Sequence, residues 1–110
     1  MTYHIHITQT AERDLNRAAD YIEFTLKNPQ AADHLLDIAE EKINHLAQFP
    51  QKFPLVDDKV LASWGIRFTK VNHYLAFYII SEEDAQVTIL RFLYMRSNWK
   101  NILKCGILLR

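Results

Sequence analysis

The residues with the most chemical potential are cationic and aromatic side chains inside apolar, strand-like segments. Arg91, Tyr94 and Arg96 stand in ILRFLYMRSNW, and Arg67 stands in the middle of GIRFTKV. A long cationic side chain among apolar neighbours is costly unless it is paired or reaches solvent. Arginine donates through a planar fork that suits a carboxylate or a phosphate. Two interpretations stay open: an internal carboxylate, or a phosphate that arrives with a substrate.

Strand periodicity predicts that these side chains do not share one surface. Neighbouring side chains on a strand point to opposite faces. Arg91 is therefore expected on the face of Ile89 and Leu93, and Tyr94 and Arg96 on the other face. A β-bulge, which adds one residue and shifts the phase, would change this assignment. One face should then hold a structural arginine and the other the functional residues.

Metal and nucleophile chemistry have weaker support. His4 and His6 share a strand face, as a metal pair would, but no HxxxH or CxxC motif accompanies them. The chain has no glycine-rich phosphate loop and no Gly-x-Ser-x-Gly elbow. Cys105 is the single cysteine, so no intramolecular disulfide can form. We therefore expect no metal and no cofactor.

The composition is that of an ordinary globular domain with an uneven charge distribution. The 110 residues, 49% of them hydrophobic, suit one domain with one core. Residues 1–48 carry eight acidic and four basic side chains, whereas residues 49–110 carry five and nine. The cationic second half favours an anionic partner, although acidic helices beside less acidic strands would give the same imbalance.

Targeting and membrane signals are not found. The longest apolar stretch, 74–80, is far shorter than the roughly 18 residues of a membrane span. The text MTYHIHITQT lacks the basic region and the long apolar stretch of a signal peptide. The sequence therefore predicts a cytoplasmic protein that does not associate with membranes.

Hydrophobic periodicity predicts the elements that position these residues. YHIHIT alternates as a short strand, and TAERDLNRAADYIEFTLKN is apolar at steps of three and four, as in a helix. Thr10 is the expected N-cap of that helix, and Leu26 belongs to its apolar face. Pro29 begins a second helix through residue 49, so the two helices should form an antiparallel hairpin.

Strands dominate the remainder of the chain. The loop FPQKFPLVDDK is followed by three strand candidates, GIRFTKV, HYLAFYII and VTILRFLYM, and SNWKNIL suits a helical turn capped by Ser97. The prediction is a single α+β domain over residues 1–110, in the order β-α-α-β-β-β with a short C-terminal helix. An antiparallel sheet would pack against the N-terminal helical hairpin. The first strand would return along an edge of the sheet or beside the last strand, and this would make the sheet mixed.

The order and spacing of these segments resemble the RelE/ParE superfamily, the toxins of bacterial type II toxin–antitoxin modules. The resemblance rests on AERDLNRAADYIEFTLKNPQAA, LAQFPQKFP, GIRFTKVNHYLAFYII and ILRFLYMRSNW, and covers nearly the whole chain. It implies a small sheet curved around a helical hairpin and a cognate antitoxin that wraps the toxin. The apolar end ILKCGILLR and an exposed sheet edge could accept that antitoxin.

Two activities are implied by this resemblance. RelE-like members cut mRNA in the decoding site of the ribosome, and ParE-like members inhibit DNA gyrase and cut no RNA. In mRNA cleavage a ribose 2′-hydroxyl attacks its own phosphate, which needs a base, a leaving-group acid and cations that stabilise the phosphorane. Ribosome-dependent mRNA cleavage is the leading hypothesis. Gyrase inhibition without catalysis, or an inactive scaffold that only binds antitoxin, is the alternative.

The resemblance also implies roles for individual residues. Arg67 matches the position of the family's phosphate-binding arginine, and Arg91 matches an arginine of the last strand that often acts similarly. Tyr94 and Arg96 fall where active members place acid, base or stacking residues. A tyrosine with an ordinary pKa near 10 is a poor base at neutral pH, so it would need cationic neighbours. Two further cations could contact RNA phosphates: Lys52 and Lys70.

Overall fold

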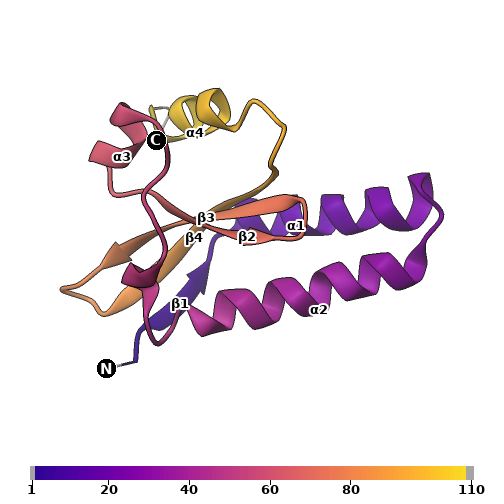
Figure 1. Ribbon diagram of the computed structural model, residues 1–110, viewed down its shortest axis with the longest axis horizontal. Helices are drawn as coiled ribbons and strands as arrows, with labels where there is room; N and C mark the ends of the chain where they lie inside the picture. Colours follow the sequence, from indigo (N-terminus) through magenta and orange to yellow (C-terminus); the bar gives the residue numbers. More distant parts are fainter. Residues whose placement is uncertain (1, 109–110) are drawn as a thin grey trace.

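The fold is a four-stranded sheet with helices on both faces (Figure 1). The computed structural model describes residues 2–108, with side chains through residue 106. The strands lie in the order β1-β4-β3-β2, with β1 parallel to β4 and the other neighbours antiparallel. In chain order the elements are β1 (His4–Ile7), α1 (Gln9–Asp20), the π-helical segment η1 (Tyr21–Thr25), α2 (Pro29–His45), the 3-10 turn η2 (Pro50–Lys52), α3 (Lys59–Ser63), β2 (Arg67–Val71), β3 (Tyr74–Ser81), β4 (Gln86–Tyr94) and α4 (Trp99–Leu108). The predicted α+β class, the main element order and the mixed sheet are confirmed.

The hairpin of α1 and α2 covers one face of the sheet. Thr8 is the N-cap of α1, since its Oγ1 accepts the Ala11 N–H at 3.1 Å. The prediction of Thr10 as N-cap is wrong because Thr10 already lies inside the helix. Asn28 caps α2, and Pro29 occupies its first turn as predicted. The larger core lies between this hairpin and the sheet and includes Leu35, Leu46, Val71, Tyr78, Ile89 and Phe92.

The first helix ends earlier than predicted, in a π-helical turn. The Leu26 N–H donates to the Tyr21 carbonyl, five residues back, at 3.1 Å. Lys27 then takes a left-handed conformation with φ 54°, which ends the segment. Residues five apart lie about 140° apart around an α-helix, whereas the wider π turn brings Tyr21 and Leu26 to one side. Leu26 is consequently 56% exposed instead of facing the core, which corrects its prediction.

Elements of the C-terminal half cover the other face. Leu103 of α4 is buried against this face, and the Trp99 and Phe77 ring centroids are 5.1 Å apart. The helix α4 is longer than the single turn predicted. The helix α3 was not predicted, and the Asp58 carboxylate ties it to α4 through an ion pair with Lys104 at 3.0 Å. A second core cluster therefore lies on this side of the sheet.

The predicted docking segment ILKCGILLR lies in α4 as far as residue 108. Leu103 within it is buried against the sheet, and residues 109–110 lie outside the described part of the chain. Over residues 2–108, none of the helices combines the length and the apolar character needed to cross a bilayer.

The strand β1 pairs only with the first part of β4. Its register matches His4 to Gln86 and Ile7 to Ile89, after which the chain turns into α1. Among the described residues no strand pairs with positions 90–94 on that side, so this part of β4 is a free edge. The first strand thus returns beside the last one, at an edge, as predicted.

Candidate functional site

Arg91 is paired with a carboxylate inside the protein. Its Nε donates to Asp14 Oδ2 at 2.7 Å and its Nη2 to Asp14 Oδ1 at 2.9 Å, which makes a bidentate ion pair between β4 and α1. Asp14 Oδ2 also accepts the backbone N–H of Phe92 at 3.0 Å. The side chain of Asp14 is 6% exposed and that of Arg91 is 24% exposed. Of the two possible partners of Arg91, an internal carboxylate or a substrate phosphate, the structure shows the carboxylate.

A β-bulge at Leu90 changes the phase of β4. Ile89 lies opposite Tyr78, and the next residue in the pairing is Arg91, so Leu90 is the extra residue. Ile89 and Phe92 consequently both face the helical hairpin, whereas Leu90 faces α4. The regular alternation predicted for this strand is wrong for that reason. Arg91 lies at the free edge, where it lines cavities beside both α1 and α4.

Arg67 is also held by the protein itself. Its Nη1 donates to the carbonyl of Phe53 at 2.6 Å and, at 3.4 Å, to that of Gln51. The neighbouring Tyr78 hydroxyl donates to the Pro50 carbonyl at 2.6 Å. Burial raises the pKa of Tyr78 to about 12, and the charge of Arg67 opposes that rise. Together these bonds attach the loop around η2 to the sheet.

Tyr94 and Arg96 lie at one end of the sheet, whereas Arg67 lies beside the middle of β3. Tyr94 pairs with Tyr74, and Arg67 pairs with Tyr78, four positions further along β3. At the rise of a strand this is about 13 Å, and β3 also intervenes. Tyr94 is 45% exposed, and Arg96 is exposed in the turn that follows β4. The four predicted catalytic residues therefore do not converge on one point.

The two predicted RNA-contact lysines are exposed on or near the edge strand β2. Lys52 ends η2, with its Nζ 5.8 Å from the centroid of the Phe53 ring. Lys70 lies on β2, and its carbonyl accepts a hydrogen bond from Lys42 Nζ at 3.1 Å. The predicted residues thus divide into a group around β2 and a group at the end of β4.

A groove of about 760 Å³ runs along the free edge of β4. Three of its lining side chains are large, apolar and exposed: Tyr21 is 52%, Leu26 is 56% and Tyr94 is 45% exposed. Exposed apolar side chains gathered in one place mark interaction sites. We call this the β4 groove; its principal lining residues are Tyr21, Leu26, His73, Tyr74, Phe92 and Tyr94.

The charge of the β4 groove is cationic at its rim. Arg17 lines it and is exposed, and its one lining carboxylate, Asp14, is already bonded to Arg91. Burial raises the pKa of Tyr74, and the neighbouring Tyr94 raises it further. Within residues 2–108 there is also no group of three or more His, Cys, Asp or Glu placed to hold a metal ion.

Sequence reasoning missed Asp14 as a site residue. Asp14 lies three residues after Ala11 and four before Ala18, on the buried stripe of α1. A carboxylate on a buried stripe requires a partner, and that position was the available signal. Tyr21 and Tyr74 were also missed. For Tyr21 the reason is that the π turn that exposes it has no clear sequence signature.

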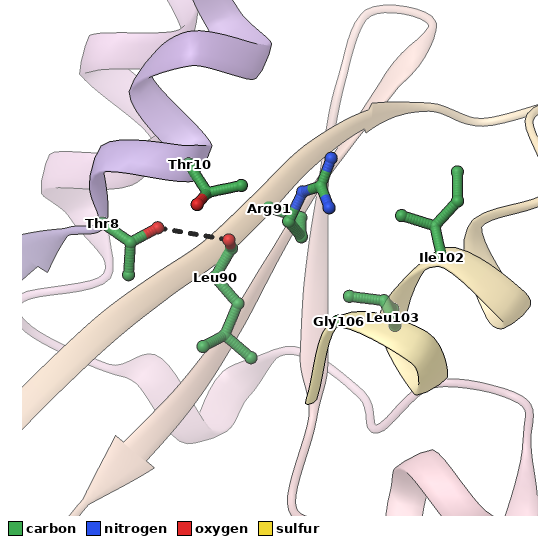
Figure 2. A pocket seen from close by; sticks show the side chains of 7 residues that line it. All are labelled: Thr8, Thr10, Leu90, Arg91, Ile102, Leu103 and Gly106. Carbon is green, nitrogen blue, oxygen red and sulfur yellow. Dashed lines mark hydrogen bonds between the residues drawn. The ribbon is translucent and has the colours of Figure 1, made fainter. Parts of the chain in front are cut away.

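A smaller cavity of about 90 Å³ lies on the α4 side of Arg91 (Figure 2). Thr8 and Thr10 bound it on one side, and Leu103 and Gly106 of α4 on the other. Thr8 Oγ1 donates to the Leu90 carbonyl at 3.2 Å. The volume corresponds to about three water molecules, which is too small for a nucleotide.

These features define a class: a small α+β domain with an open, apolar groove beside the sheet edge that carries Arg91. Residues 5–99 match the family model described as the ParE toxin of type II toxin–antitoxin system, parDE. The chain belongs to this family, and the RelE/ParE resemblance is confirmed.

Solved structures with a similar fold come from toxin–antitoxin systems. A chain of the chromosomal ParDE system from P. aeruginosa aligns with a TM-score of 0.70 at 18% identity, over 86% of this chain and 98% of that one. A chain of the toxin–antitoxin complex RelBE2 from Mycobacterium tuberculosis aligns with a TM-score of 0.58 at 21% identity, over 86% and 92%. No curated protein matches the sequence.

Proposed function

We propose that this toxin of a type II toxin–antitoxin system arrests growth by binding DNA gyrase and cuts no RNA. The proposal is supported by one observation: both arginines that were expected to bind phosphate already make hydrogen bonds within the protein. Arg91 is paired with Asp14, and Arg67 donates to two loop carbonyls. Each guanidinium keeps free N–H donors, but turning it toward a phosphorane would break these internal bonds.

The position of the acid–base candidates supports the same proposal. Cleavage needs a base and an acid within hydrogen-bond reach of the reacting atoms. Tyr94 lies far from Arg67 along the sheet, and its neighbour Tyr74 has a raised pKa. The match to the ParE family also favours gyrase, since the resemblance implies this target for ParE-like members.

Ribosome-dependent mRNA cleavage is the second candidate, favoured by the exposure of Tyr94 and Arg96 at the end of β4. In that case these residues would meet the mRNA, and Lys52 and Lys70 would contact its phosphates. In either case we propose action in the cytoplasm, with a cognate antitoxin as the neutralising partner.

Induction of the chain alone tests the proposal. We expect growth arrest, intact cellular mRNA in primer extension, and induced DNA-damage signalling. Codon-phased cuts that disappear in Tyr94→Phe and Arg96→Ala would instead identify the nuclease. Both variants change exposed side chains, so loss of folding should not imitate loss of cleavage. Absence of growth arrest would leave only antitoxin binding.

A further inference from the structure

We propose that the loop around η2 presents a surface that binds an acidic segment of DNA gyrase with an exposed apolar side chain. The surface consists of five residues that line one cavity, and we call it the η2 surface: His45, Gln48, Phe49, Lys52 and Phe53. The inference rests on the proposed function, in which gyrase is the target. It adds the part of the toxin that makes the contact and the chemistry of the segment that it contacts.

Phe49 is the most exposed residue of its kind on the η2 surface. It is 70% exposed, more than any other large hydrophobic side chain that the structure describes. A single exposed apolar side chain is ordinary on a protein surface, so its exposure alone does not mark a contact. The fixed conformation of the loop, the cavity beside the ring and the charge around it are the features that point to a partner.

A ring of hydrogen bonds fixes the η2 loop two residues after Phe49. Gln51 Nε2 donates to the Tyr3 hydroxyl at 2.7 Å and to Glu82 Oε1 at 2.8 Å, and the Tyr3 hydroxyl donates to Glu82 Oε2 at 2.7 Å. Arg67 and the Tyr78 hydroxyl donate to carbonyls of the same loop. The loop therefore has little freedom left to lose when a partner binds, and such preorganisation favours association.

The cavity of the η2 surface has the size of a side-chain pocket. Its volume is about 230 Å³, which is below the roughly 300–1,000 Å³ of small-molecule sites. Phe49 and Phe53 give it aromatic walls. Interfaces are commonly anchored by one apolar side chain that fills such a pocket on the partner. The cavity thus suits an apolar side chain of a protein better than a cofactor.

The charge of the η2 surface favours an acidic segment. Lys52 lines the cavity, and among the residues that the structure describes no acidic side chain lines it. Lys42 lies about one turn before His45, and its Nζ donates to the Lys70 carbonyl at 3.1 Å, which brings two further lysines together near the end of α2. Glu41 is the nearest acid along α2 and does not line the cavity. A carboxylate of the partner would therefore meet Lys52 without an opposing charge inside the cavity.

A nucleic acid fits the η2 surface less well than a protein. Bases stack on open ring faces, but Lys52 Nζ lies over the Phe53 ring, 5.8 Å from its centroid. The chain as a whole has a formal net charge of zero, whereas affinity for nucleic acid depends on many contacts between cations and phosphates. A protein segment needs one apolar anchor and a few complementary charges.

Inhibition of supercoiling by purified gyrase tests the surface. We expect Phe49→Asp to raise the half-inhibitory toxin concentration by about 30-fold and Lys52→Glu by about 10-fold, as for anchor and charged positions of an interface. Phe24→Asp is the matched control for the first variant, because Phe24 is 68% exposed and lies in η1. Lys100→Glu, exposed on α4, is the control for the second. Both controls should stay within about 3-fold of the unmodified chain. Thermal unfolding confirms that each variant is folded.

Hydrogen exchange on the toxin–gyrase complex locates the contact independently, and protection should fall on residues 48–53. Inhibition by folded Phe49→Asp and Lys52→Glu at the unmodified dose, or protection elsewhere only, would overturn the surface and leave gyrase as the target. So would a loss of inhibition in Phe24→Asp alone. A lack of gyrase binding by the unmodified chain would contradict the target and the surface together. Protection of residues 48–53 by a single-stranded RNA oligonucleotide, lost in Lys52→Glu, would assign the surface to RNA instead.

Discussion

Asp14 and Arg91, 77 positions apart in the chain, form a bidentate ion pair that joins α1 to the free edge of β4. The same carboxylate accepts the Phe92 N–H, so one side chain satisfies three donors at the place where β1 has ended. The family resemblance implies that Arg91 binds phosphate, but its partner in the structure is Asp14.

Removing this carboxylate should destabilise the fold. We expect Asp14→Ala to lower the free energy of unfolding by about 3 kcal/mol, because it leaves a partly buried guanidinium without its partner. In an Arg91→Ala background the same change should cost clearly less, since the two residues act as a pair. Urea unfolding measures both values. Glu12→Ala, an exposed acid in the first turn of α1, should stay within about 0.5 kcal/mol. Equal losses for Asp14→Ala and Glu12→Ala would contradict the pairing.

Arg67 should contribute to stability through the η2 loop. We expect Arg67→Met to cost about 1–2 kcal/mol, because the Phe53 carbonyl loses a charged donor at 2.6 Å. Lys70→Met, on the same strand and exposed, is the control and should have little effect. Denaturant unfolding compares the two variants. If Arg67→Met is as stable as the unmodified protein, the bonds from Arg67 to the η2 loop do not stabilise the fold.

Tyr78 should make stability decrease at alkaline pH. Burial raises its pKa from 10.0 to about 12, so the folded state favours the neutral phenol. This contribution is complete below pH 10 and is lost as the pH rises toward 12, by about 2 kcal/mol at pH 12. Tyr78→Phe should lose about 1 kcal/mol at neutral pH with the bond to Pro50. Its unfolding free energy should then fall less than that of the unmodified protein between pH 10 and 12. Parallel curves over that range would contradict the assignment.

The hydroxyl of Tyr94 should not be needed for toxicity. Tyr94→Phe keeps the ring that packs edge-on against Tyr74 and removes only the group that a nuclease would use. We expect growth arrest on induction to equal that of the unmodified chain within about 2-fold in inhibitory dose, since a hydroxyl at an exposed position has little weight. Survival of cells that express Tyr94→Phe at normal levels would favour the cleavage mechanism.

The main elements could be predicted because their signals are local. Alternation in YHIHIT and GIRFTKV, the helical spacing from Ala11 to Ile22 and Pro29 at a helix start all depend on neighbouring residues. The short helix α3 follows a proline-containing loop and has only one buried residue, Leu61, so periodicity could not reveal it.

The site was harder to predict because it depends on contacts distant in sequence. The bulge at Leu90 changes which face of the sheet the following side chains of β4 occupy, and no residue type at that position indicates a bulge. The partner of Arg91 lies on α1, and only the buried position of Asp14 hinted at a pairing. The grouping of Arg67, Arg91 and Tyr94 came from a family resemblance, whereas the strand register separates them.

Inhibition of purified DNA gyrase is the most direct test of the central claim, that the toxin acts by binding and without RNA cleavage. We expect the purified chain to abolish supercoiling of relaxed plasmid in a dose-dependent way, and prior addition of its antitoxin to restore it. Arg96→Ala, outside the groove lining, should inhibit as well as the unmodified chain. Full supercoiling at every toxin concentration, together with cut mRNA on translating ribosomes, would contradict the claim.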